Sequence, residues 1–134
     1  MVYDIPFSIQ YDSESEPYLM LVNWLIAFLV TLFIEALIYT CPPFQAWFKR
    51  SKIHRLRICL LANLSTHPLI FLVLPNLVFV PYWEYVAMAE LIALFGEWYV
   101  LSRFGVARPF TVSLIANLCS WQLGGVLVGL LARY

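Results

Sequence analysis

Charged residues are scarce in this chain of 134 residues. Asp, Glu, Lys and Arg make up 12% of the sequence, hydrophobic residues make up 63%, and the mean hydropathy is +0.82. An ordinary soluble domain carries charge on roughly 25% of its residues, and a soluble chain of this size has more surface than so few charges can cover. The composition excludes an ordinary soluble domain and predicts an integral membrane protein, with the lipid bilayer as its first partner.

Disulfide patterns and the motifs of soluble enzymes are absent as well. The three cysteines, Cys41, Cys59 and Cys119, are an odd set that lies in or beside apolar runs. The sequence has no CxxC, HExxH, GxGxxG, Walker or GxSxG motif. We therefore expect no cofactor, no metal ion and no soluble-type enzymatic activity. The net charge of zero predicts no nucleic-acid partner.

Four apolar runs are long enough to cross a membrane as helices. A helical span needs about 20 apolar residues, and the runs cover 18–41, 57–80, 83–102 and 109–132. They lack the alternation of a barrel strand, so helices are the expected form. We predict an all-α integral membrane protein, a four-transmembrane-helix bundle built from two tandem helix hairpins. It occupies residues 18–134, after an acidic non-cytoplasmic tail at residues 1–17.

Basic residues concentrate in two loops, which predicts the orientation. Arg103 and Arg108 lie between the third and fourth runs, and only Arg133 lies elsewhere. The other five follow the first run and extend to the first residue of the second: Lys49, Arg50, Lys52, Arg55 and Arg57. The positive-inside rule places the loops 42–55 and 103–108 in the cytoplasm and both termini outside, as in a bacterial or archaeal inner membrane.

The first basic loop also contains aromatic residues. Phe44, Trp47 and Phe48 are interleaved with Lys and Arg along residues 42–55. This pattern suits a short helix that lies in the cytoplasmic headgroup layer. The alternative is a plain basic loop that obeys the positive-inside rule.

Two matching pairs of carboxyl and amide side chains lie inside the apolar runs. Glu35 and Asn63 belong to the first hairpin, Glu97 and Asn117 to the second. The flanking segments repeat: Leu-Phe-Ile-Glu (32–35) with Leu-Phe-Gly-Glu (94–97), and Ala-Asn-Leu-Ser (62–65) with Ala-Asn-Leu-Cys (116–119). All four lie roughly 9–14 Å from the cytoplasmic ends of their helices. We call these four residues the polar layer and expect a Glu–Asn contact inside each hairpin.

An ionisable group in hydrocarbon is expensive, so it marks a functional site by default. The polar layer therefore indicates proton or cation handling. The alternative is that each Glu–Asn pair only joins the two helices of its hairpin.

Glu90 and His67 distinguish the two halves. Glu90 precedes Glu97 by seven residues, which places both carboxyl groups on one face about 10 Å apart. The matching residue in the first half is Phe28, so a polar path would belong to one repeat only. His67 precedes Pro68, which is expected to kink the second span near mid-membrane, as in transporter binding sites.

Each of these features has a plainer alternative. His67 can instead be a packing residue that bonds a neighbouring Glu. A metal site at His67, Glu35, Glu97 and Cys119 has no ligand spacing in its favour. Gly125 and Gly129 form a GxxxG pattern in the fourth run, which suits close helix packing within the chain or against a partner.

Three functions follow from this sequence. The first is a small oligomeric transporter that binds or conducts protons, cations or a small solute, with protonation of Glu35 and Glu97 as the coupling step. The second is a non-catalytic accessory subunit that packs against a larger membrane-protein partner. The third is a membrane enzyme that uses His67 and the acids. The candidate substrate-binding or ion-binding residues are Glu35, Asn63, His67, Glu90, Glu97 and Asn117.

Overall fold

The structure is a computed structural model that describes residues 16–78 and 80–131. In this part of the chain the backbone is helical apart from short turns and contains no strand. The elements are α1 (Glu16–Thr40), α2 (Pro42–Phe48), α3 (Lys52–Pro68), the π-helical turn η1 (Leu69–Val73), α4 (Leu74–Leu77), α5 (Tyr82–Arg103) and α6 (Pro109–Leu131). The all-helical fold class is confirmed, whereas nearly all of the predicted tail lies outside the described residues.

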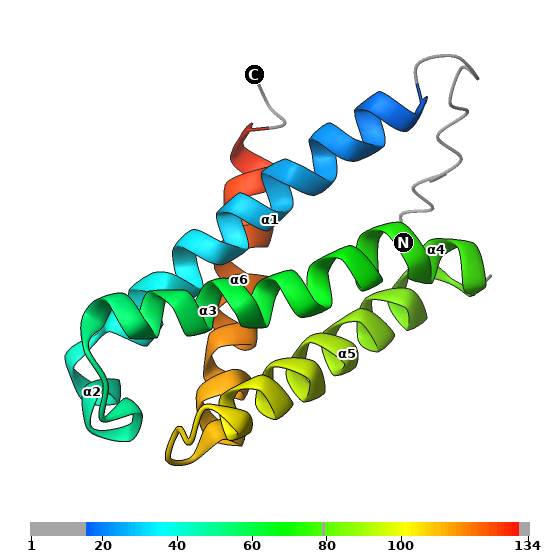
Figure 1. Ribbon diagram of the computed structural model, residues 1–134. Helices are drawn as coiled ribbons and strands as arrows, with labels where there is room; N and C mark the ends of the chain where they lie inside the picture. Colours follow the sequence, from blue (N-terminus) through cyan, green and yellow to red (C-terminus); the bar gives the residue numbers. More distant parts are fainter. Residues whose placement is uncertain (1–15, 79, 132–134) are drawn as a thin grey trace, which may run out of the picture.

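The long helices pack in a closed ring. α1 packs against α3 and α6, and α5 packs against the same two helices. In Figure 1, α3 and α5 run side by side while α6 crosses behind α1. Side chains from all four helices meet at the centre of this ring, where the polar layer lies.

Two helical segments of the described chain are long and apolar enough to cross a membrane. They are Lys52–Leu77, made of α3, η1 and α4, and Trp83–Arg103 in α5. A third candidate is a bent pair, Trp24–Thr40 with Pro42–Phe48, which turns by 79°. These findings support an integral membrane protein. The second span begins earlier than predicted because the extended Ser51 starts the helix at residue 52 rather than 57.

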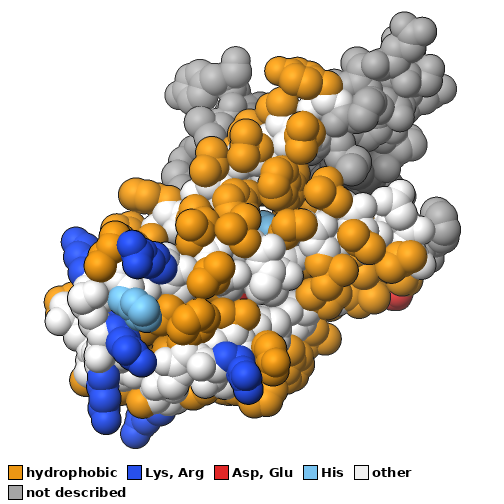
Figure 2. Space-filling view, in the orientation of Figure 1, with side chains coloured by type: hydrophobic (Ala, Val, Ile, Leu, Met, Phe, Trp, Pro, Cys, Tyr) orange, Lys and Arg blue, Asp and Glu red, His pale blue; other side chains and the backbone are white. Residues whose placement is uncertain are grey.

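The outer surface suits a lipid environment. α1 exposes large apolar side chains at every fourth position, which line up along one face: Leu21, Leu25, Leu29, Phe33 and Leu37. Such continuous apolar surface is rare on soluble monomers. Figure 2 shows hydrophobic side chains spread over the face in view, with Lys and Arg gathered at the end where α2 lies.

The two basic loops meet at that end of the molecule. The backbone N–H of Ala107 donates to the carbonyl of Trp47 at 2.7 Å, and the Arg108 guanidinium lies 5.5 Å from the centre of the Trp47 ring, in cation–π contact. Gly105, with φ +69°, allows the chain to leave α5 in the left-handed conformation. The loops 42–55 and 103–108, which are far apart in the sequence, therefore form one basic surface.

α2 is a short helix, which was one of the two alternatives for this loop. Phe48 is buried in a hydrophobic cluster with Tyr39, and Phe44 and Trp47 pack against the same cluster. The aromatic side chains thus pack on the protein's own core, because the sharp bend after Thr40 folds α2 back onto α1 and α3.

The helix is irregular directly after Pro68, where a kink was expected, but the second span continues through it. α3 ends at Pro68, but η1 and α4 continue it, and Lys52–Leu77 is a single span. Proline lacks a backbone donor, and a π-helical turn accommodates the change by shifting the hydrogen-bond register. The hydroxyl of Tyr85 in α5 donates to the carbonyl of Ile70 in this turn at 2.7 Å. The irregular backbone is therefore tied to α5.

Gly96 marks the closest approach of α5 to α3. A Cβ at this position would lie 2.6 Å from Cγ2 of Thr66, whereas a Cβ at Gly124 would lie 3.8 Å from Val30. Gly96→Ala should lower the free energy of unfolding by about 1–3 kcal/mol, since overpacking forces the helices apart. Denaturation with SDS in mixed micelles, followed by circular dichroism, measures this change. Gly124→Ala is the matched control, and an equal loss of stability in both variants would contradict the close approach at Gly96.

Candidate binding site at the polar layer

The first hairpin brings Glu35 and Asn63 together as predicted. Both side chains are completely buried, and Nδ2 of Asn63 donates to Oε2 of Glu35 at 2.6 Å. The same amide nitrogen donates to the backbone carbonyl of Cys59, one turn earlier, at 3.1 Å. Because Asn63 is anchored to its own helix, its second hydrogen is directed at the carboxyl group on α1.

The second hairpin has the same arrangement, so the second predicted contact is also confirmed. Nδ2 of Asn117 donates to Oε2 of Glu97 at 2.8 Å and to the carbonyl of Ser113, one turn earlier, at 2.9 Å. Oγ of Ser113 lies 3.5 Å from the same carboxyl oxygen. The two hairpins thus repeat a pattern of bonds as well as a short sequence.

α6 joins the two glutamates. Oγ of Ser120 donates to Oε1 of Glu35 at 3.2 Å and also lies 3.1 Å from the carbonyl of Asn117. Asn117, three residues earlier on the same face, bonds Glu97. A carboxyl group from α1 and one from α5 therefore contact one face of α6, and the polar layer is a connected network across the ring.

Two acceptor atoms of this network have no partner in the described structure. They are Oδ1 of Asn63 and Oε1 of Glu97, which belong to the adjacent helices α3 and α5. Buried acceptors without a donor are costly, by about 1–3 kcal/mol each. A proton on the Glu97 carboxyl group, or a bound cation, would give these oxygens a partner.

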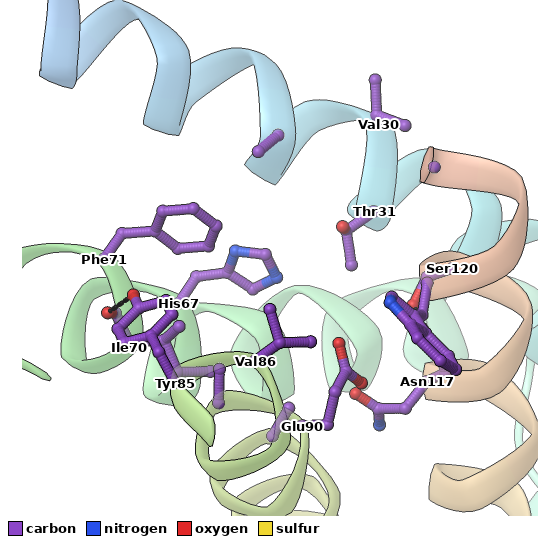
Figure 3. Close-up of a pocket in the computed structure, with 15 residues that line it drawn as sticks. Val30, Thr31, His67, Ile70, Phe71, Tyr85, Val86, Glu90, Asn117 and Ser120 are labelled. Atoms are coloured by element: carbon purple, nitrogen blue, oxygen red, sulfur yellow. Dashed lines mark hydrogen bonds between the residues drawn. The ribbon is translucent and has the colours of Figure 1, made fainter. Parts of the chain in front are cut away.

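A cavity of about 370 Å³ opens directly above this network. Its lining comes from α1, α3, η1, α5 and α6, and includes Asn117 and Ser120, which bond the two glutamates. Figure 3 shows His67 and Phe71 on one side of the cavity, Asn117 and Ser120 on the other, and Glu90 between them at its base. The volume falls in the range of small-molecule sites, roughly 300–1,000 Å³.

Glu90 is placed differently from the other two acids. It is half-buried, it lines the cavity, and it forms no hydrogen bond or ion pair with another described residue. Ala93, which lies between Glu90 and Glu97, is buried. In the first half the corresponding Phe28 is also buried and contacts the ring of His67. The sequence difference between Glu90 and Phe28 thus makes the two halves contribute differently to the cavity.

His67 forms part of an aromatic stack. Its ring lies parallel to Phe71 with centroids 5.6 Å apart and meets Phe28 edge to face at 5.4 Å. Nδ1 of His67 is buried without a hydrogen-bond partner, so the structure does not show the predicted alternative of a bond to a neighbouring Glu. His67 acts here as a wall of the cavity.

Two predicted features remain, the metal site and the glycine pattern of the fourth run. Within residues 16–78 and 80–131, no group of three or more His, Cys, Asp or Glu side chains is placed to hold a metal ion. Gly125 and Gly129 belong to α6, but their surroundings lie outside the described residues. The small-residue surface that the structure does describe is Gly124, which lines the cavity near Val30.

Ser113, Ser120 and Tyr85 are functional candidates that the sequence analysis missed. Both serines keep a fixed spacing to Asn117, at −4 and +3, and Cys59 and Thr66 stand at the same spacings from Asn63. This repeat of small polar residues around each Asn could have identified both serines as site residues. No comparable signal marks Tyr85, because its role depends on how α5 packs against η1.

Comparison with known family models, curated protein sequences and solved structures yields no match to this chain.

Proposed function

We propose that this chain is a small membrane transporter or ion-conducting unit, active as an oligomer, in which the polar layer exchanges protons or cations with a solute in the cavity. The observation that carries this proposal is that two side chains belong both to the cavity wall and to the polar network. Asn117 and Ser120 face the cavity and also bond Glu97 and Glu35. A ligand in the cavity that contacts these two side chains therefore acts on the groups that hold both buried carboxyl groups.

Protonation gives a physical route for coupling. A carboxylate accepts hydrogen bonds, whereas a protonated carboxyl group also donates one, so protonation of Glu97 changes which atoms Asn117 and Ser113 can bond. Titratable groups near Glu97 come from α1, α3 and α5, while α6 contributes only neutral side chains. They are Glu35, Tyr39, Cys59 and Glu90.

The proposal includes four membrane spans, with α1 and α6 completing the ring around the two clearest candidates. In this arrangement the basic surface formed by residues 42–55 and 103–108 lies in the cytoplasm, the cavity lies toward the outside, and both termini lie outside. Each half then begins and ends on the same side, so the two hairpins are related by an axis along the membrane normal.

Cysteine labelling tests this orientation. In a chain whose three native cysteines are replaced by serine, Lys52→Cys and Ala107→Cys should react with a membrane-impermeant maleimide only from the cytoplasmic side. Both positions are exposed and belong to the loops 42–55 and 103–108, which carry six of the eight basic residues. Labelling in intact cells compared with inside-out vesicles gives the answer, and reaction of either position from outside would overturn the orientation.

Proton flux in liposomes tests the transport function. The purified chain should admit protons under an imposed membrane potential, reported by an internal pH-sensitive dye. Glu97→Gln should abolish this flux and leave the helical fold intact, because the amide keeps the shape of the side chain but cannot titrate. Glu84→Gln, which changes an exposed acid in the first turn of α5, is the control and should conduct normally. Unchanged flux in Glu97→Gln would contradict the proposal.

An accessory subunit is the second candidate, and the Glu–Asn bonds themselves favour it. Each bond joins two helices of one hairpin, and such bonds contribute about 0.6–2 kcal/mol in lipid. In that case Glu97→Gln is harmless or stabilising. Mass determination in mild detergent separates the candidates, since a homo-oligomer supports transport and a stoichiometric, co-purifying membrane partner supports the subunit.

A further inference from the structure

We propose that the cavity binds a monovalent organic cation, an ammonium group carried on an aromatic or aliphatic body. This inference rests on the proposed function and names the class of solute. It follows from three observations on the described chain: an unpaired carboxyl group at the base of the cavity, aromatic walls around it, and a second apolar cavity on the other side of that carboxyl group.

The charge in the cavity lacks a partner. Glu90 is half-buried and has no hydrogen bond or ion pair with a described residue. The nearest basic residue along α5 is Arg103, thirteen residues later, about 20 Å along the helix. All the other Lys and Arg of the described chain belong to the same basic end. A carboxylate in an apolar setting needs a counter-charge, and a bound cation provides it.

The walls of the cavity favour an organic cation over a hydrated metal ion. His67, Phe71, Tyr85 and Trp121 all line it, and His67 and Phe71 are fixed in parallel by their stacking. Aromatic faces attract ammonium groups and exclude water, and combined with a carboxylate they form the usual setting for alkylammonium recognition. A small metal ion would instead require several ligands around it, and the described residues contain no group of three or more His, Cys, Asp or Glu side chains placed to hold one.

Access from the lipid phase suits an amphiphilic cation. A second cavity of about 290 Å³ lies between α5 and α6, and it shares Glu90 and Asn117 with the first. Its other lining residues are apolar, and Leu91 and Leu118 are exposed on the outer surface. Glu90 and Asn117 therefore stand between a lipid-facing opening and the central cavity. An amphiphile can reach the carboxyl group through the bilayer, where its apolar body concentrates.

Binding of benzyltrimethylammonium to the purified full chain in detergent tests the inference. Its neutral isostere, neopentylbenzene, has the same shape without the charge. Isothermal titration calorimetry should show that the wild-type chain binds the cation at least tenfold more tightly than the neutral compound. Glu90→Gln should weaken cation binding at least tenfold and leave neopentylbenzene binding unchanged. Glu84→Gln, on the exposed start of the same helix, should bind both compounds like the wild type.

The outcomes separate this inference from the proposed function. Equal affinity for the two compounds, no binding of the cation, or full cation binding in Glu90→Gln would each overturn the organic-cation site. Proton flux that depends on Glu97 would survive any of these results, because Glu97 belongs to the polar layer below the cavity. Conversely, Glu90-dependent cation binding without any flux would support the site and contradict transport.

Discussion

Glu35→Ala is expected to lower the free energy of unfolding by about 3 kcal/mol or more, because it removes the acceptor that joins three helices. Asn63 from α3 and Ser120 from α6 both donate to the Glu35 carboxyl group on α1, and the site is completely buried. Alanine leaves one hydrogen of the Asn63 amide without a partner and opens a cavity as well. SDS denaturation followed by circular dichroism measures the loss.

A double-mutant cycle shows whether the unpaired amide causes this loss. Glu35→Leu combined with Asn63→Leu should be much less destabilising than the sum of the two single changes, since both partners of the buried bond become apolar. Ser120 keeps a partner in the double variant because its hydroxyl also reaches the carbonyl of Asn117. Simple additivity of the two single effects would show that Glu35 and Asn63 do not depend on one another.

Arg55→Leu is expected to destabilise the fold by about 2 kcal/mol or more. Arg55 is only 5% exposed, and its Nη1 donates to the carbonyl of Tyr39 at 3.2 Å. Tyr39 lies in the last turn of α1, where carbonyls lack helical partners and where a positive charge is favourable. Leucine leaves that carbonyl unpaired at the bend between α1 and α2, and the same denaturation experiment reports the effect.

Arg57 provides the control for this change. It lies two residues later in α3 but is exposed, so Arg57→Leu should change the unfolding free energy by less than about 0.5 kcal/mol. Equal effects of the two leucine variants would mean that the loss of charge, and not the bond to Tyr39, determines stability at this end of the molecule.

The polar layer could be predicted from the sequence for two reasons: the depth of the four side chains in the membrane, and the free-energy cost of exposing a carboxyl group to lipid. Counting residues from the basic loops placed all four side chains at one level, and the expense of a carboxyl group in lipid directed Glu35 and Glu97 inward. The two Glu–Asn bonds follow directly from these arguments, and the structure contains both.

Other parts of the site depend on helix rotation and packing, which a single sequence does not determine. The bond from Ser120 to Glu35 joins residues 85 positions apart, and it requires α6 to lie against α1. The π-helical turn after Pro68 depends on a donor from Tyr85 in another helix. The burial of Phe48 likewise depends on the 79° bend between α1 and α2, whereas the local pattern of aromatic and basic residues left a headgroup-layer helix and a plain basic loop as alternatives.

Infrared difference spectroscopy of the reconstituted protein tests the central claim most directly, because it reports protonation of buried carboxyl groups. Between acidic and alkaline buffer, with the helical amide bands unchanged, the wild type should lose an absorption band of protonated carboxyl groups. Part of that band should be absent from Glu97→Gln and fully retained in Glu84→Gln. A spectrum without any carboxyl change that depends on Glu97, over the whole pH range in which the protein stays folded, would contradict a polar layer that exchanges protons.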